Sequence, residues 1–188
     1  MTALWAPDAV FQMVRIGVSA VNLHARVFAI NSPFRFSEHG IIAHPLMYGL
    51  ILFARTLGQH SRLVSATLNS PASLHLKAWV VRVAENTLHI LLLNKGATAA
   101  TFALHLPAVG TGSVERLLAP SPTSKENEVT FAGQRIGEDA TWRGKRVVEA
   151  LSPGADGYRV TIRGYSAAVL RFTVRPGPSQ HAANACCA

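Results

Sequence analysis

Three side chains in the first part of the chain, His24, Arg26 and Asn31, have the types and the placement best suited to chemistry. They follow residues 18–23, a short apolar and β-branched stretch typical of a central parallel strand, so we expect them beyond the carboxyl end of that strand. The imidazole of His24 could hydrogen-bond a hydroxyl or a carboxylate, and the guanidinium of Arg26 suits a carboxylate or a sulfate. The alternatives are a core histidine satisfied by the backbone and a loop arginine that is only solvated.

The ten Asp and Glu side chains supply no pair placed for acid and base catalysis. Hydrolysis of a glycosidic bond requires two carboxylates that flank the bond. Asp8 is expected in a helix, Glu85 in a hairpin turn and the acids of residues 126–139 in polar loops. Each of these, like Glu115, is expected to be solvated. Only Glu38 lies in a loop that leaves the carboxyl end of a predicted barrel strand. Glu38 is therefore the one carboxylate kept as a catalytic alternative.

The elements around these residues are typical of one and a half repeats of a β/α barrel. A helix is predicted from Ala3 to about Ile16, with Gly17 ending it, and the strand over 18–23 follows. A long loop, 24–44, leads to a second helix that starts at Pro45 and ends near Gly58. A complete barrel needs eight such units, so residues 1–58 are expected to be the terminal portion of a (β/α)8 barrel: helix, last strand, loop and helix.

After Gly58 the hydrophobic period changes from that of helices to that of strands. Apolar residues alternate with polar ones in segments separated by Gly, Pro, Asn and Ser, which predicts about eight strands in an antiparallel β-sandwich over residues 59–175. The segments are 63–68, 74–81, 88–93, 102–106, 114–118, 129–131, 158–163 and 165–174. His75, His89 and His105 are expected on the outer face of the sandwich. The predicted fold class is therefore mainly β, a C-terminal antiparallel β-sandwich preceded by an α-β-α remnant of a (β/α)8 barrel.

Composition narrows the classes of partner. The net charge of +8 favours acidic partners such as nucleic acid, anionic lipid or an anionic polysaccharide, although the basic residues are scattered. No apolar run is long enough to cross a bilayer, and no signal peptide is visible. Cys186 and Cys187 are adjacent in a tail, residues 176–188, that we expect to be disordered. No metal site and no cofactor motif is predicted.

Several segments resemble the C-terminal part of family 79 glycoside hydrolases, the group of β-glucuronidases and heparanase-like enzymes. The resemblance extends over residues 2–174, and its order and spacing are more specific than any single piece. The matching segments near the N-terminus are Ala3-Leu4-Trp5-Ala6, Phe11-Gln12-Met13, Gly17-Val18, Val21-Asn22-Leu23-His24, Asn31-Ser32-Pro33-Phe34 and Pro45-Leu46-Met47-Tyr48-Gly49-Leu50-Ile51-Leu52-Phe53-Ala54. Those in the predicted sandwich are Leu76-Lys77-Ala78-Trp79, Leu91-Leu92-Leu93-Asn94-Lys95, Arg116-Leu117-Leu118-Ala119-Pro120-Ser121, Val129-Thr130-Phe131-Ala132-Gly133-Gln134 and Tyr165-Ser166-Ala167-Ala168.

The resemblance implies a catalytic β/α barrel followed by a β-sandwich packed against it, and a retaining mechanism with two glutamates. Both glutamates are expected on earlier barrel strands, upstream of Met1, so this chain is expected to hold no catalytic residue and to be inactive alone. His24 corresponds to a histidine that helps to line the sugar site. Asn31 stands where many members carry a tyrosine that contacts the substrate carboxylate, a departure that bears on glucuronide specificity. Arg26 is a candidate to replace that contact.

Two functions from different classes follow. The first is the C-terminal accessory portion of a retaining glycoside hydrolase, whose partners are carbohydrate, possibly containing uronic acid, and the missing N-terminal barrel segment. Alone, such a portion should expose apolar surface and dissolve poorly. The second is a stand-alone β-sandwich module that binds acidic polysaccharide, which should tolerate deletion of residues 1–58. Nucleic-acid binding has only the net charge in its favour, and it predicts a steep salt dependence.

Overall fold

A computed structural model of the chain describes residues 2–25 and 32–175. The helices are α1 (Thr2–Arg15), α2 (Pro45–Thr56), η1 (Ala72–Leu74) and η2 (Glu126–Glu128). The strands are β1 (Phe34–Ser37), β2 (Gly40–Ala43), β3 (Arg62–Val64), β4 (Leu76–Ala84), β5 (Thr87–Asn94), β6 (Ala100–Leu104), β7 (Gly112–Leu118), β8 (Thr130–Phe131), β9 (Arg135–Ile136), β10 (Trp142–Arg143), β11 (Glu149–Leu151), β12 (Tyr158–Ile162) and β13 (Ser166–Thr173).

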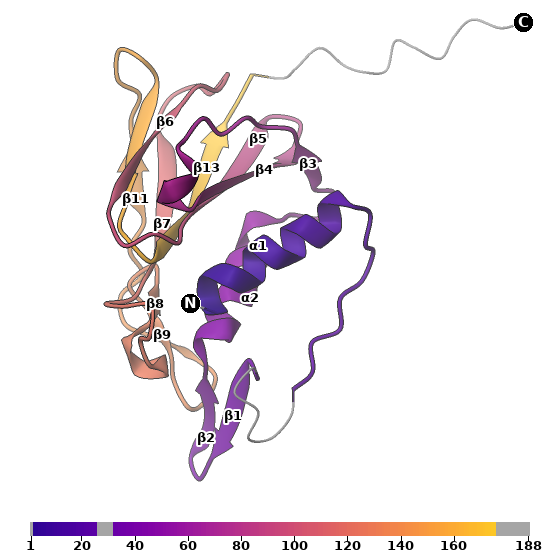
Figure 1. Ribbon diagram of the computed structural model, residues 1–188, viewed down its shortest axis with the longest axis vertical. Coiled ribbons are helices and arrows are strands. Elements are labelled where there is room, and N and C mark those ends of the chain that lie inside the picture. Colours follow the sequence, from indigo (N-terminus) through magenta and orange to yellow (C-terminus); the bar gives the residue numbers. More distant parts are fainter. Residues whose placement is uncertain (1, 26–31, 176–188) are drawn as a thin grey trace, which may run out of the picture.

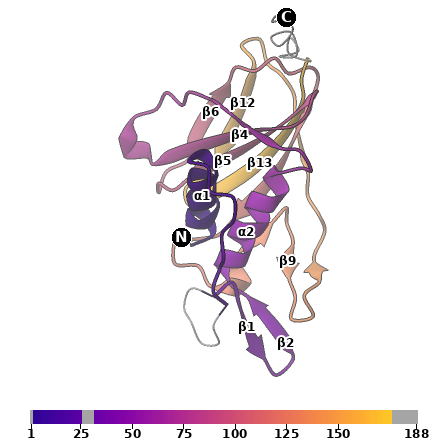
Figure 2. The same ribbon diagram turned by 90° about the vertical axis from the view of Figure 1, so that its right-hand side faces the viewer.

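The centre of the molecule is an antiparallel sheet. Within the described residues it has seven strands in the order β11-β7-β13-β5-β4-β3, with β8 paired to β7. α1 and α2 lie against one face of this sheet, and β6 and β12, which pair with each other, lie against the other (Figures 1 and 2). The mainly β, antiparallel fold class predicted from the sequence is confirmed.

β5 shows why the sheet needs a cover on each face. Leu88, Ile90 and Leu92 point toward β6 and β12 and belong to the core on that side. Leu91 and Leu93 point the other way, into the core beneath the helices, and neither has any exposed surface. Because successive side chains of a strand point to opposite faces, such an unbroken apolar run fits only a strand buried on both faces.

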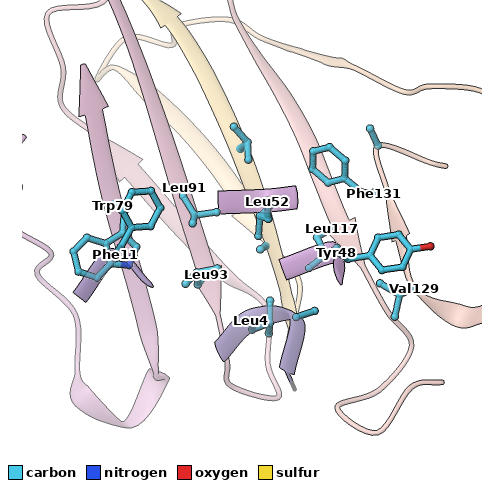
Figure 3. Packing of buried hydrophobic residues seen from close by; sticks show 14 of the residues in the cluster. Leu4, Phe11, Tyr48, Leu52, Trp79, Leu91, Leu93, Leu117, Val129 and Phe131 are labelled. Atoms are coloured by element: carbon cyan, nitrogen blue, oxygen red, sulfur yellow. The ribbon is translucent and has the colours of Figure 1, made fainter. Parts of the chain in front are cut away.

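The helix-side core joins α1 and α2 to the sheet. The ring of Phe11 on α1 stacks on Trp79 of β4, with centroids 5.4 Å apart and planes 17° from parallel. Leu52 on α2 is fully buried in the same cluster (Figure 3). The helices approach each other closely at Gly49, where an added Cβ would lie 2.7 Å from the carbonyl oxygen of Ala3. Truncation of a residue buried as deeply as Leu52 costs about 2–5 kcal/mol.

A hairpin stands where the sequence predicts only a loop. β1 and β2 pair antiparallel within the predicted loop 24–44 and project from the lower end of the molecule (Figure 1). The backbone N–H of Ile41 donates to the carbonyl of Glu138 at 2.8 Å, which attaches the hairpin to the segment between β9 and β10. At Gly40, whose φ is +136°, an added Cβ would meet that same carbonyl oxygen at 2.1 Å. The tip therefore requires glycine.

The boundaries of the predicted elements need two corrections. Residues 18–23 do not form the predicted strand: the segment has no strand pairing within the described residues. A strand needs a neighbour to satisfy its backbone, and the described residues place none beside it. The segment between the predicted strands 129–131 and 158–163, for which no strand is predicted, contains the short strands β9, β10 and β11. Gly17 does end α1 as expected, with φ +88°. The tail, 176–188, lies outside the described residues.

Candidate functional site

The predicted site residues do not gather into a pocket. His24 is exposed, in the unpaired segment that follows α1. Arg26 and Asn31 lie outside the described residues. Glu38, the carboxylate kept as a catalytic alternative, is exposed in the turn between β1 and β2.

Four exposed apolar side chains precede His24 in the chain. Ile16 is 75% exposed, Val18 39%, Val21 38% and Leu23 44%. We call these four side chains the 16–23 strip. Apolar side chains that stand in water beside unpaired backbone are typical of a surface that another polypeptide covers.

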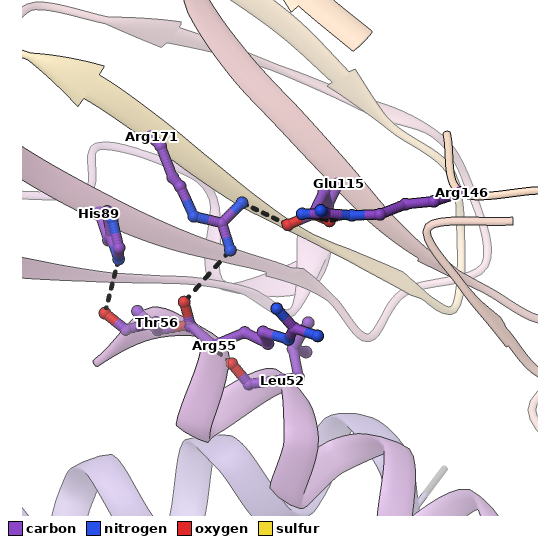
Figure 4. A network of polar contacts seen from close by, with 7 residues as sticks. All are labelled: Leu52, Arg55, Thr56, His89, Glu115, Arg146 and Arg171. Carbon is purple, nitrogen blue, oxygen red and sulfur yellow. Dashed lines mark hydrogen bonds and ion pairs between the residues drawn. The ribbon is translucent and has the colours of Figure 1, made fainter. Parts of the chain in front are cut away.

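The most extensive polar network of the molecule surrounds a buried carboxylate, Glu115, contrary to the prediction that it is solvated. Glu115 on β7 is 1% exposed and lies between Arg171 of β13 and Arg146 (Figure 4). Arg171 donates through Nη1 to Oε2 of Glu115, and Arg146 donates through Nε and Nη2 to Oε1, at 2.8 and 2.7 Å. Burial alone would raise the pKa of Glu115, but the hydrogen bonds and charges of Arg171 and Arg146 hold it below its usual value.

This network lies under the C-terminal end of α2. Arg171 donates through Nη2 to the carbonyl of Arg55 at 3.4 Å, and the Nδ1 of His89 contacts the carbonyl of Thr56 at 3.1 Å. The last carbonyls of a helix have no partner within it and carry partial negative charge, so these donors satisfy and stabilise the helix end. Burial and the charge of Arg171 lower the pKa of His89. His89 therefore lies beneath α2, contrary to the prediction of an outer-face position.

A second buried acid anchors α1. Asp8 is 7% exposed, accepts a hydrogen bond from Nε1 of Trp79 at 2.9 Å and pairs with Lys95 at the end of β5. The prediction that Asp8 is a solvated helix residue is therefore wrong. Asp8 and Glu115 hold one helix each on the same face of the sheet.

Sequence signals for these two acids exist. Glu115 interrupts an apolar strand at the same parity as Leu117, which is buried on the helix side. Asp8 lies one helical turn before the buried Phe11 on α1. Each position indicates a buried charge that needs a partner, but neither shows which cation supplies it.

The chemistry open to these groups is limited. Each buried carboxylate is held by cations, an arrangement that positions helices and offers neither a free general base nor a proton donor. Across residues 2–25 and 32–175, no group of three His, Cys, Asp or Glu side chains is placed to hold a metal ion. No helix in those ranges is long and apolar enough to span a membrane. The two buried carboxylates therefore serve to position α1 and α2 on the sheet.

Part of the chain matches a known protein family. Residues 78–169, from β4 into β13, match the family described as "Glycosyl hydrolase family 79 C-terminal beta domain". No curated protein sequence matches the chain.

Solved structures share the fold over nearly the whole chain. A 4-O-α-L-rhamnosyl-β-D-glucuronidase from Fusarium oxysporum 12S superposes with a TM-score of 0.72 at 17% identity, over 89% of this chain and 38% of that one. A family 30 subfamily 8 xylanase from Clostridium acetobutylicum gives 0.61 at 14% identity, over 92% and 39%. A family 51 arabinofuranosidase from Xanthomonas axonopodis pv. citri gives 0.58 at 15% identity, over 91% and 35%. The chain thus spans well under half the length of each of these enzymes.

Proposed function

We propose that the chain, whose residues 78–169 match the glycosyl hydrolase family 79 C-terminal beta domain, is the accessory portion of a retaining glycoside hydrolase of the β-glucuronidase or heparanase type. In this proposal residues 1–58 complete a (β/α)8 barrel and residues 59–175 form the β domain packed on it. Both catalytic glutamates belong to the missing barrel segment, and the chain alone does not hydrolyse glycosides.

The observation that carries the proposal is the 16–23 strip. Its side chains are apolar, exposed and attached to a backbone with no strand partner. α1, which precedes the strip in the chain, and α2, which follows it, both pack on the sheet. The strip is therefore attached to a well-packed core. A neighbouring barrel strand would satisfy the backbone of 18–23 and bury these side chains at once.

The site residues follow from the same placement. His24 stands directly after the strip, where the carboxyl end of the closing barrel strand would be. We assign His24, with Arg26 and Asn31, to contacts with the sugar, Arg26 being the group suited to a uronic acid carboxylate. The substrate class proposed for the complete enzyme is therefore a carbohydrate that contains uronic acid.

Solution behaviour tests the docking surface. The purified chain should self-associate in sedimentation velocity and bind a hydrophobic dye, and the double variant V18S/V21S should reduce both signals. V147S/V148S is the matched control, because Val147 and Val148 are each 48% exposed on the far part of the chain and should not matter. A parent chain that sediments as a monomer without dye binding would overturn the proposal that this strip is covered by a partner.

An activity assay and the gene context test whether the chain is the accessory portion of a glycoside hydrolase. Purified chain should not turn over an aryl β-glucuronide; turnover that disappears in Glu38→Gln would contradict the accessory role. The DNA upstream of the Met1 codon should encode β/α units with an Asn-Glu pair at the end of a strand. Unrelated coding sequence there would count against a barrel partner in the same gene.

A further inference from the structure

The sheet has an open edge beside β4. β3 pairs with β4 only at Val80–Arg82, so within the described residues Leu76–Trp79 has no strand partner on that side. A cavity of about 680 Å³ lies along this edge, between β4, the segment 65–70 and the last turn of α1. A second cavity of about 330 Å³ adjoins it and shares Ser70, Leu76 and Lys77 with it. We call the two together the β4-edge cleft. Its size is that of a small-ligand site.

The ionisable side chains that line this cleft are all basic. Arg15, His75, Lys77 and Lys95 contribute to its walls, and no Asp or Glu does. Lys95 is neutralised by Asp8 behind it. Among the residues that the structure describes, neither Arg15 nor Lys77 belongs to an ion pair, although Arg15 donates to Gln12 at 2.7 Å. Arg15 at the end of α1 and Lys77 on β4 therefore each bring a positive charge without a counter-charge to the cleft.

The remaining wall combines polar groups with aliphatic side chains and offers no stacking platform. Ser65, Ser70 and Gln12 present hydroxyl and amide groups that can bond the hydroxyls of a sugar. Trp79 is only 7% exposed and already stacks on Phe11, while the guanidinium of Arg15 lies 5.8 Å from its ring centroid. Single-stranded nucleic acid is held chiefly by bases stacked on exposed aromatic rings, which this cleft lacks. An anionic ligand rich in hydroxyl groups fits the lining better.

We propose that the β4-edge cleft binds an acidic oligosaccharide, with Arg15 and Lys77 pairing with its carboxylate or sulfate groups and the serine hydroxyls with its sugar hydroxyls. This binding does not depend on the docking of the 16–23 strip. It would give the β domain a glycan-holding role of its own, separate from bond cleavage.

Calorimetric titration of the full chain tests the cleft with three probes. These are a tetrasaccharide of alternating glucuronic acid and N-acetylglucosamine, a heparin tetrasaccharide, and the neutral cellotetraose. The acidic probes should bind, with affinity that falls as salt is added, and cellotetraose should not. Preference between the two acidic probes identifies carboxylate or sulfate as the group recognised.

Matched variants separate a site from general charge. Lys77→Gln and Arg15→Gln should each weaken binding about tenfold, the effect of losing one hydrogen bond to a charged group. Arg159→Gln removes the same charge from an exposed position on β12 and should change nothing. V18S/V21S should also bind normally, which keeps this test independent of the proposed docking.

Four results would overturn the proposal. They are equal weakening by Arg159→Gln and Lys77→Gln, equal binding of cellotetraose, full competition by a single-stranded oligonucleotide of matched charge, and failure of both acidic probes to bind. Because Lys77 is exposed, its variant should keep the parent's unfolding midpoint, so a lost affinity there reports on the site.

Discussion

Replacement of Glu115 by glutamine tests whether the buried network holds α2 on the sheet. The change keeps the shape of the side chain and one acceptor oxygen but removes the charge that Arg171 and Arg146 share. The helix end above it, at Arg55 and Thr56, would then lie beside cations with no counter-charge. A loss of stability is expected, and its size follows from how far each partner is exposed.

The two arginines should differ. The side chain of Arg171 is 25% exposed and that of Arg146 is 53% exposed. A hydrogen bond to a charged group contributes about 1.5–3 kcal/mol when protected, whereas a solvated ion pair contributes less than about 1 kcal/mol. We therefore expect Glu115→Gln to lower the free energy of unfolding by about 2 kcal/mol and Arg146→Gln by about 0.5 kcal/mol. Arg171→Gln, which strands a buried carboxylate, should cost about 3 kcal/mol.

Urea denaturation at pH 7 followed by tryptophan fluorescence measures these differences, with protein dilute enough to suppress association. Because the pKa of Glu115 is lowered in the folded chain, its contribution is present above about pH 4 and is lost as the pH falls through the folded pKa. The penalty of Glu115→Gln should shrink accordingly in acid. The reasoning is refuted if Arg146→Gln costs as much as Glu115→Gln, or if Glu115→Gln lies within about 0.5 kcal/mol of the parent.

Two further substitutions probe the packing. The lowered pKa of His89 means that the folded chain resists protonation there, so the free energy of unfolding should fall as the pH drops below about 6.5. In thermal melts at pH 7.5 and 5.5, His89→Asn should flatten this decline and the exposed-site control His75→Asn should not. Gly40→Ala should destabilise the chain more than Gly17→Ala in chemical denaturation, because both have positive φ but only Gly40 would collide with the Glu138 carbonyl. Equal losses would contradict that contact.

Alternation of apolar residues was sufficient to locate the main strands. The predicted segments 88–93, 114–118 and 158–163 coincide with β5, β7 and β12 to within one or two residues. The periodicity of 46–57 likewise predicted α2. These elements are long and bury a clear face, so their local pattern and their tertiary environment agree.

The wrong predictions concern residues whose burial depends on parts of the chain that are distant in sequence. His89 was assigned to an outer face because a sandwich strand usually has one, yet α1 and α2 cover that face. Glu115 and Asp8 were assigned to solvent because carboxylates usually are solvated, yet their cations arrive from positions 56 and 87 residues away. A charge buried by a distant partner leaves only an out-of-place residue in the sequence.

The same packing removes one test that would have separated the two functions. A stand-alone sandwich was expected to tolerate deletion of residues 1–58, but that deletion would uncover Trp79, Leu91, Leu93 and Val169 on the helix side of the sheet. Each is nearly or fully buried, and about 25 cal/mol is lost for every Å² of apolar area returned to water. Such a deletion should unfold the β domain whichever function is correct, so it cannot discriminate between them. Only substitutions that leave this core intact, at the 16–23 strip and at the β4-edge cleft, can do so.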